Sequence, residues 1–192
     1  QLKSTLLNAF LQEEEIGERR QRLQLAEQLP QGWFGELLMD EVEEPMAELA
    51  AVLAPWLAPE PQTLEVAIVL PQGCLQGWLV VREGRLILHK PGHLHGRDFL
   101  LAWIQHLCLS LSAESGMSQE TLLFDMEMSW RLRPVPASDA RAWLGELVAS
   151  WAEGMTRPLP LFPKSAWAWI NSYDKEADLD KAQKAAQNAF ND

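Results

Sequence analysis

Three consecutive β-strands are predicted in the middle of this chain, and no other feature restricts its fold as much. Their ranges are 62–70, 75–82 and 85–90, and all three are rich in Val, Ile and Leu, which favour extended backbone. A tight hairpin is expected at Glu83 and Gly84, between the second and third strands. Residues 62–90 are therefore expected to supply the first strands of the core.

One helix and two further strands are predicted after these three. Apolar residues recur at helical spacing over about 99–112 and predict a helix with Asp98 as its cap. Alternating apolar positions predict strands at about 120–126 and 128–133. Asp125 and Glu127, two apart, would share one face of such a strand, and a solvated face is favoured over an acid–base or metal pair.

Helices are predicted before and after the strands. Their ranges are 2–12, 18–28 and 33–53 before them, and 139–154, 164–171 and 177–190 after them. Pro45 is expected to end or kink the third helix, and residues 55–61 to form a proline-rich connection. The prolines at 158, 160 and 163 indicate a stiff link. We therefore predict one domain at 1–156, with a C-terminal segment at 157–192 packed on it.

The charge of the chain is uneven, and this restricts its partners. The net charge is −11, which argues against a stand-alone nucleic-acid binder. Residues 1–70 carry −9, residues 71–110 carry +2 and residues 111–192 carry −4. Arg82, Arg85, Lys90 and Arg97 lie in the positive stretch and are the candidates for phosphate contact. A solvated hairpin edge is the favoured alternative for these cations, because Lys and Arg protect exposed strands.

The cysteines and histidines of the chain predict no cofactor. Cys74 and Cys108 lie in apolar patterns and are expected to be buried free thiols in a reducing cytoplasm. His89, His93 and His95 could bind Zn²⁺ or Ni²⁺, but exposed or structural histidines are favoured and no metal is predicted. His106 is expected to be half-buried in the core. No signal peptide or membrane span is expected.

Two tryptophans near the C-terminus are candidates for a subunit interface. Trp167 and Trp169 stand beside Leu161 and Phe162 in a proline-rich setting. Tryptophan is enriched at protein interfaces, but the same cluster could clamp the segment onto its own domain. The two interpretations are equally supported. The chain begins at Gln1 without Met, so it is expected to be part of a longer protein.

Several stretches, kept in order, resemble the C-terminal domain of the exodeoxyribonuclease V gamma subunit family (RecC). The stretches that carry the resemblance are Leu29–Glu36 (LPQGWFGE), Gln76–Leu79 (QGWL), Leu101–Leu107 (LAWIQHL) and the end segment from Pro158–Pro163 (PLPLFP) through Ala182. The resemblance implies an α/β fold with a restriction-endonuclease-like core. In that fold, a central mixed sheet of about five strands is flanked by helices.

The resemblance also implies that the catalytic positions of active nucleases of this fold are lost. Glu36 falls where active members carry a His, and Val80 falls where they carry an Asp. His89 and Pro91 stand near the positions of the Asp-x-Lys motif. Val80 and Pro91 cannot bind Mg²⁺ or supply a positive charge, and a neutral His89 cannot replace a hard carboxylate ligand. Phe99 and Trp103 are expected to fill the vacated site.

The function that this resemblance implies is a non-catalytic scaffold and DNA guide for double-strand break repair and recombination. The partners would be the other subunits of the RecBCD helicase–nuclease, RecB and RecD, and a double-stranded DNA end in the assembled complex. One alternative is an active Mg²⁺-dependent nuclease with displaced ligands among Glu36, Asp125 and Glu127. The other alternative is a subunit-docking module that makes no contact with DNA.

Overall fold

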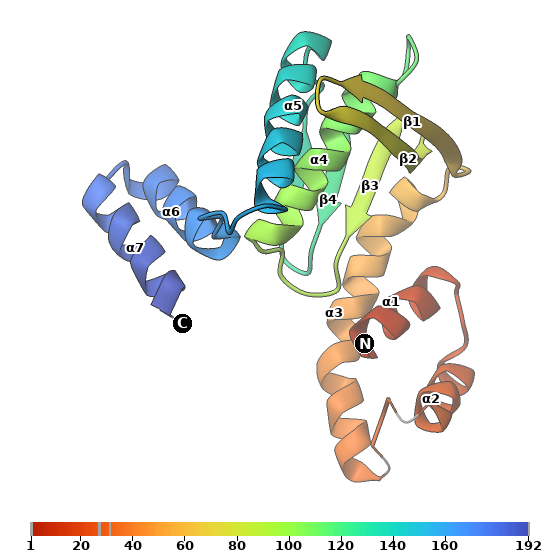
Figure 1. Cartoon of the computed structure of the whole chain (residues 1–192). Helices are drawn as coiled ribbons and strands as arrows, with labels where there is room; N and C mark the ends of the chain where they lie inside the picture. The colour runs from red at the N-terminus through yellow and green to blue at the C-terminus, as the bar shows by residue number, and fades with distance from the viewer. Residues whose placement is uncertain (1, 27, 31, 192) are drawn as a thin grey trace. The chain divides into compact units, whose positions relative to one another are not determined.

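The computed structural model describes residues 2–26, 28–30 and 32–191 (Figure 1). Gln31, in the first resembling stretch, lies outside them. The helices in the described part are α1 (Leu2–Leu11), α2 (Ile16–Leu25), α3 (Trp33–Leu57), α4 (Gly96–Ser112), α5 (Ala137–Gly154), α6 (Pro163–Glu176) and α7 (Leu179–Asn191). The strands are β1 (Gln62–Leu70), β2 (Gly73–Arg82), β3 (Arg85–His89), β4 (Thr121–Phe124) and β5 (Ser129–Leu132). None of the described helices is both long and apolar enough to cross a bilayer.

The strands form one mixed sheet in the order β1-β2-β3-β4-β5. β2 pairs with β3 and β4 pairs with β5 in antiparallel fashion, whereas β3 and β4 are parallel. Parallel neighbours need a long crossover, and the segment that contains α4 supplies it between β3 and β4. The predicted α/β fold with a mixed sheet of about five strands is confirmed. Its likeness to restriction endonucleases stays a prediction.

The β2–β3 hairpin follows directly from its sequence. Arg82 pairs with Arg85 across a two-residue turn, and Glu83 and Gly84 both have positive φ angles of 48° and 72°. A two-residue turn with both central residues in this region matches the right-handed twist of the strands. The hairpin predicted at Glu83 and Gly84 is therefore confirmed, and it fixes where the arginines on either side of the turn lie.

The chain divides into two compact units, each assembled from separate stretches of sequence. Unit 1 consists of residues 1–62, 80–93 and 120–132, and unit 2 of residues 63–79, 94–119 and 133–192. The core of unit 1 joins α1, α2 and α3 to β4 through buried side chains such as Leu7, Leu23, Met46 and Phe124. The predicted division near residue 156 stays a prediction.

Unit 2 contains α4 and the three helices after β5, and aromatic side chains join several of these helices. Trp103 of α4 lies against Trp143 of α5, with ring centroids 5.6 Å apart. Phe99 of α4 stacks on Trp167 of α6 with centroids 3.9 Å apart. Phe162 contacts Phe190 at the far end of α7. Phe99 and Trp103 therefore each pack on a neighbouring helix, and their filling of a vacated catalytic site stays a prediction.

Helix α3 continues through both of its prolines, so the prediction that Pro45 ends it is wrong, and the alternative prediction of a kink at Pro45 stays a prediction. The helix runs to Leu57 with Pro45 and Pro55 inside it. A proline in a helix interior removes one hydrogen bond and costs about 3 kcal/mol. Val42, Met46, Leu49 and Leu53 are buried on one face of α3, and the burial of each such side chain contributes about 1.5–3 kcal/mol. Burial along this face therefore outweighs the cost of the prolines.

Asp125 and Glu127 do not lie on a strand, so the predicted shared strand face is wrong. Residues 125–128 form the turn between β4 and β5. The Asp125 Oδ1 atom accepts hydrogen bonds from the backbone N–H groups of Glu127 and Met128, at 2.9 Å and 2.8 Å. An aspartate that binds the amides two and three residues ahead favours a turn over an extended strand. Asp125 is therefore buried in a structural role rather than solvated.

Candidate functional site

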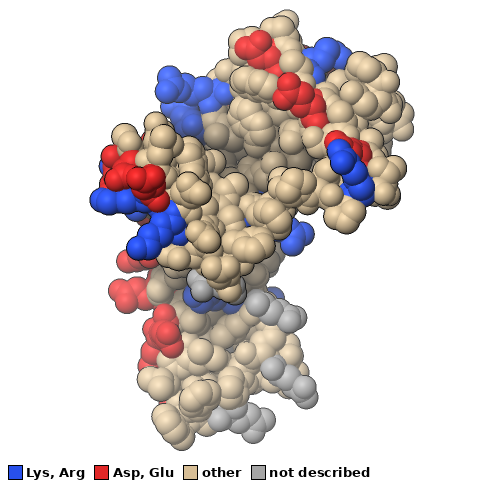
Figure 2. All heavy atoms as spheres, turned by 60° about the vertical axis from the view of Figure 1, so that its left-hand side comes forward, with Lys and Arg blue, Asp and Glu red and all other residues tan. Residues whose placement is uncertain are grey.

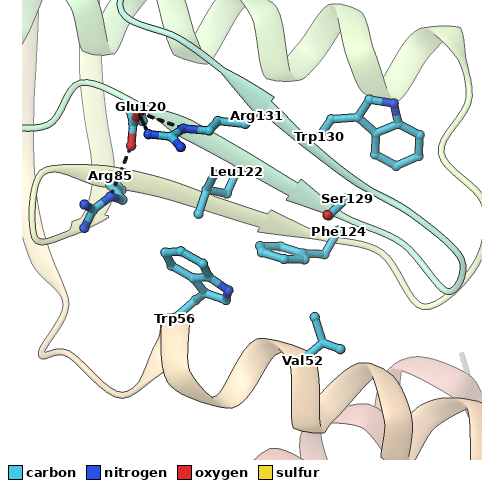
Figure 3. A pocket seen from close by; sticks show the side chains of 9 residues that line it. All are labelled: Val52, Trp56, Arg85, Glu120, Leu122, Phe124, Ser129, Trp130 and Arg131. Atoms are coloured by element: carbon cyan, nitrogen blue, oxygen red, sulfur yellow. Dashed lines mark hydrogen bonds and ion pairs between the residues drawn. The ribbon is translucent and has the colours of Figure 1, made fainter.

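A pocket of about 460 Å³ lies between the C-terminal half of α3 and strands β4 and β5 of unit 1 (Figure 3). Helical spacing brings Val52 and Trp56 to the same face of α3. Phe124 pairs with Ser129 and Leu122 with Arg131, so these four side chains lie on one face of the sheet. The full lining consists of Val52, Trp56, Arg85, Glu120, Leu122, Phe124, Ser129, Trp130 and Arg131.

Glu120 lies between two arginines at one end of this pocket. Its side chain is only 11% exposed. Arg131 Nε donates to Glu120 Oε1 at 2.8 Å, with a second donation from the same guanidinium, and Arg85 Nε donates to Oε2 at 3.4 Å. In Figure 3, dashed lines join the Glu120 carboxylate to both arginines. A buried carboxylate needs such partners, because leaving it unpaired costs several kcal/mol.

The two arginines leave neither carboxylate oxygen of Glu120 free to bind a metal cation. Both carboxylate oxygens of Glu120 already accept charge-assisted hydrogen bonds, so an Mg²⁺ ion would have to displace guanidinium groups. Arg85 also donates to Glu83 at 3.1 Å. Among the residues that the structure describes, no group of three or more His, Cys, Asp or Glu side chains is placed to hold a metal ion.

Two of the four predicted phosphate contacts lie close together in unit 1. Arg82 and Arg85 both line a neighbouring hollow of about 270 Å³ beside Trp56, and they flank the β2–β3 turn. Both also serve the fold, since Arg82 donates to the carbonyl oxygen of Pro59 and Arg85 binds Glu120. Lys90 follows β3 in unit 1, and the exposed Arg97 lies in the first turn of α4 in unit 2. A role for these four residues in DNA contact stays a prediction.

Within the described residues, the positions that the resemblance assigns to lost catalytic residues form no group of metal ligands. Val80 is exposed on β2, His89 ends β3 and Pro91 lies in the following loop. Glu36 lies in the first turn of α3, and sixteen residues of helix place it about 24 Å from Val52 in the pocket. The donor atoms at these four positions, one carboxylate and one imidazole, do not fit an Mg²⁺ ion, which needs several oxygen ligands.

Two further histidines, His93 and His106, lie in different surroundings. His93 Nε2 lies 3.9 Å from Glu127 Oε1, and both side chains are exposed. His106 is fully buried rather than half-buried, and its Nε2–H donates to the carbonyl oxygen of Arg133 at 2.9 Å. Desolvation lowers the pKa of His106 and also that of His89.

The two cysteines also differ from each other. Cys108 is buried in α4, as predicted, and desolvation raises the pKa of its thiol. Cys74 is exposed, so the prediction that it is buried is wrong. It lies at the start of β2, where the side chains alternate between the two faces and its own points to solvent. Neither thiol is in a disulfide.

The two candidate interface tryptophans, both in α6, make different contacts. Trp167 stacks on Phe99, and its Cβ lies where a side chain on Gly96 would have to fit. It therefore clamps α6 onto α4 within unit 2. Trp169 stacks on Tyr173 of its own helix, with centroids 5.1 Å apart. Of the two residues, Trp169 is the better candidate for contact with another subunit, and this role stays a prediction.

The pairing of Glu120 with Arg85 and Arg131 was not predicted from the sequence. Glu120 lies 35 residues from Arg85 and 11 from Arg131, so no local spacing connects them. The only sequence signal is an acidic residue directly before the apolar run Thr121–Phe124. A carboxylate next to a fully buried strand requires a cationic partner, but only the parallel pairing of β3 and β4 identifies Arg85.

Comparison with known proteins places the chain in a family. The model of the RecC C-terminal domain family matches residues 1–174. The RecBCD enzyme subunit RecC of Escherichia coli (strain K12) is 30% identical over 180 residues, which cover 93% of this chain and 16% of that protein. The RecBCD enzyme subunit RecC of Buchnera aphidicola subsp. Schizaphis graminum is 22% identical over 182 residues, which cover 94% of this chain and 17% of that protein.

The fraction of each relative that the chain covers limits what the similarity implies about function. The chain spans only 16% and 17% of the lengths of these two curated relatives, so their activity as whole proteins does not transfer to it directly. The family model nevertheless matches more than nine tenths of the described chain, from α1 into α6. The chain belongs to the RecC C-terminal domain family.

Proposed function

We propose that this chain is a non-catalytic domain that acts as a scaffold and DNA guide in a cytoplasmic helicase–nuclease of the RecBCD kind. Its partners would be the other subunits of that complex, RecB and RecD, and the end of a DNA duplex undergoing repair. The observation that carries the proposal is the state of Glu120. This pocket carboxylate is bound by two guanidinium groups, so it stabilises the fold rather than a catalytic cation.

The acidic residues of the displaced-ligand alternative support the same conclusion. Asp125 Oδ1 is bound by two backbone amides of its own turn. Glu36 lies about 24 Å along α3 from the pocket, and Glu127 is exposed in the turn after β4. Two-metal cleavage requires carboxylates that converge within a few ångströms of each other. These three residues therefore make a poor nuclease site.

A cleavage assay separates the proposal from an active nuclease. The purified chain is incubated with linear double-stranded DNA and either Mg²⁺ or Mn²⁺, and the DNA is analysed on a denaturing gel. We expect no cleavage above a metal-free control. Cleavage that disappears on Glu36→Ala or Glu127→Ala would establish the displaced-ligand nuclease instead. Cleavage that survives both changes would point to a contaminating enzyme, which a second purification removes.

The docking-module alternative is tested in the assembled complex. The full-length subunit that carries this domain receives Arg97→Glu or, separately, Trp169→Ala, and the complex is reassembled with its other subunits. As a DNA guide, the domain should lose affinity for duplex ends on Arg97→Glu while the complex still assembles. Unchanged end binding and unwinding in that variant, together with weakened assembly on Trp169→Ala, would instead favour a module that only docks subunits.

A further inference from the structure

The pocket beside α3 is the middle of a longer groove within unit 1. A hollow of about 240 Å³ adjoins it on one side and shares Val52, Phe124 and Ser129 with it. The hollow of about 270 Å³ beside the β2–β3 turn adjoins it on the other side and shares Trp56 and Arg85. We refer to these three adjoining hollows as the α3 groove. It follows the C-terminal half of α3.

The middle of the α3 groove is apolar and open to solvent. Val52 is 52% exposed and Trp56 is 39% exposed, and in Figure 3 both point from α3 toward the sheet side chains Leu122 and Phe124. Met128, at the edge of the groove, is also exposed. Large apolar side chains grouped in an open groove favour a binding surface over a plain solvated one. Tryptophan is one of the side chains enriched among the residues that dominate the binding energy of protein interfaces.

The two ends of the α3 groove carry opposite charges. Glu48 and Glu127 line one end, and both are exposed. Arg82 and Arg85 line the other end, where Glu83 pairs with Arg85. Arg131 lines the middle hollow together with Arg85, and Glu120 pairs with both of these arginines. Arg131 remains 65% exposed while it holds Glu120. An occupant that lies along the groove therefore meets acidic groups, then apolar side chains, then guanidinium groups.

We propose that the α3 groove docks an amphipathic segment of a partner subunit. The segment has a basic side chain that meets Glu48 and Glu127, apolar side chains that contact Val52 and Trp56, and an acidic side chain that meets Arg131. This inference rests on the proposed scaffold function and gives its docking surface a location and a direction. The charge order of the groove sets the direction, because the reversed segment would place like charges together at both ends.

A protein segment fits these charges better than a nucleic-acid strand does. A DNA or RNA strand carries negative charge along its whole length. It would place phosphates next to Glu48 and Glu127 at one end of the groove. Arg131 remains 65% exposed beside Glu120, so it can meet a single acidic side chain without a row of phosphates along the rest of the groove. A peptide can instead match each end separately.

Assembly of the complex with a matched pair of valine variants tests the docking surface. Val52→Glu places a charge in the apolar middle of the groove, and Val69→Glu places the same charge on β1, where Val69 is 71% exposed. Each is introduced into the full-length subunit and co-purified with the other subunits. We expect Val52→Glu to weaken capture of a partner at least 10-fold and Val69→Glu to leave it unchanged, with equal melting temperatures. Equal capture by both variants would overturn the proposal.

Crosslinking from the two ends of the groove tests the predicted direction. A photoreactive amino acid replaces Glu127 in one variant and Arg131 in another, and crosslinked peptides are identified by mass spectrometry. The proposal requires one partner segment, crosslinked near a Lys or Arg from position 127 and near an Asp or Glu from position 131. The reversed charge order, or crosslinks to DNA alone, would refute it.

The outcomes also separate this inference from the proposed function. If Val52→Glu assembles normally and Arg97→Glu weakens binding of duplex ends, the domain guides DNA but its partner docks elsewhere. If the subunit without this whole domain still assembles and unwinds DNA normally, the scaffold function fails and the groove proposal fails with it. Loss of assembly in Val52→Glu, with normal assembly in Val69→Glu, supports both.

Discussion

His106 is a buried residue whose charge state is tied to folding. It is fully buried in α4, and its Nε2–H donates to the Arg133 carbonyl oxygen. Desolvation lowers its pKa, and the hydrogen bond only partly opposes that shift. Its folded pKa therefore lies below the unfolded value of about 6.5. The stability that depends on neutral His106 is complete above that pH and is lost as the pH falls toward the folded pKa.

We predict that the free energy of unfolding decreases below about pH 6.5, by at most about 1.4 kcal/mol per pH unit from His106. His106→Gln keeps a donor for the Arg133 carbonyl oxygen but does not titrate, so it should flatten this slope even if it lowers stability overall. Urea unfolding at several pH values measures the slope. His93→Gln is the control, because that side chain is exposed. An unchanged slope in His106→Gln would contradict the assignment.

At the scale of single residues, the sequence predicts burial and helix capping, which depend on neighbouring residues. It does not predict ion pairs between residues far apart in the chain. Cys108 was correctly predicted to be buried because the apolar pattern of its helix surrounds it. Asp98 does cap α4, although from inside the helix, where its carboxylate accepts the backbone N–H of His95 at 2.9 Å. Glu120 could not be assigned its role, because its partners come from two other strands. Local spacing does not contain that information.

At the scale of elements, the sheet was easier to predict than the helix ends. β1 and β3 differ little from their predicted ranges because apolar side chains alternate with polar ones or fill the strand. α3 was predicted too short because proline disfavours a helix interior when only the local sequence is considered. The burial of Met46 and Leu53, which stabilises the helix, depends on packing against α1 and β4. Asp125 was predicted to lie on a strand because the alternation of apolar and polar residues continues through it. That alternation gives no information on the hydrogen bonds that Asp125 accepts from the turn amides.

The packing of α6 on α4 gives a prediction at the same scale. A Cβ atom on Gly96 would lie 2.8 Å from the Cβ of Trp167 and closer still to the Pro163 carbonyl oxygen. Gly96→Ala should therefore push α6 away from α4 and disturb the Phe99–Trp167 stack. Overpacking of this kind costs about 1–3 kcal/mol. We expect a lower melting temperature and faster proteolysis in the link at residues 157–162.

Gly145→Ala is the matched control for this change. Gly145 lies inside α5, and a Cβ there meets no atom within 4 Å. The same glycine-to-alanine change should stabilise that helix by about 0.5–1 kcal/mol. A destabilised Gly145→Ala variant, or a Gly96→Ala variant with unchanged melting and proteolysis, would show that the α4–α6 contact does not limit the position of α6.

At the scale of the whole molecule, the charge distribution limits how the chain can meet DNA. The first seventy residues carry −9 and only residues 71–110 carry a positive net charge. On the face drawn in Figure 2, Lys and Arg side chains stand in separate groups interspersed with Asp and Glu, rather than in one continuous stripe. Composition alone predicted this restriction, because net charge acts over distances that do not depend on the fold.

We therefore predict that the purified chain binds duplex DNA weakly and through few phosphates. If contact is limited to Arg82, Arg85, Lys90 and Arg97, the logarithm of the association constant should fall with the logarithm of salt concentration with a slope no steeper than about −4. Fluorescence anisotropy of a labelled duplex, measured across a salt series, gives this slope. Arg97→Glu should make it shallower, because one counterion fewer is released. Arg157→Glu is the control, since Arg157 is exposed and pairs with Glu153 at the end of α5. A steeper slope, or an equal effect of both changes, would mean that DNA is held by cations outside residues 71–110.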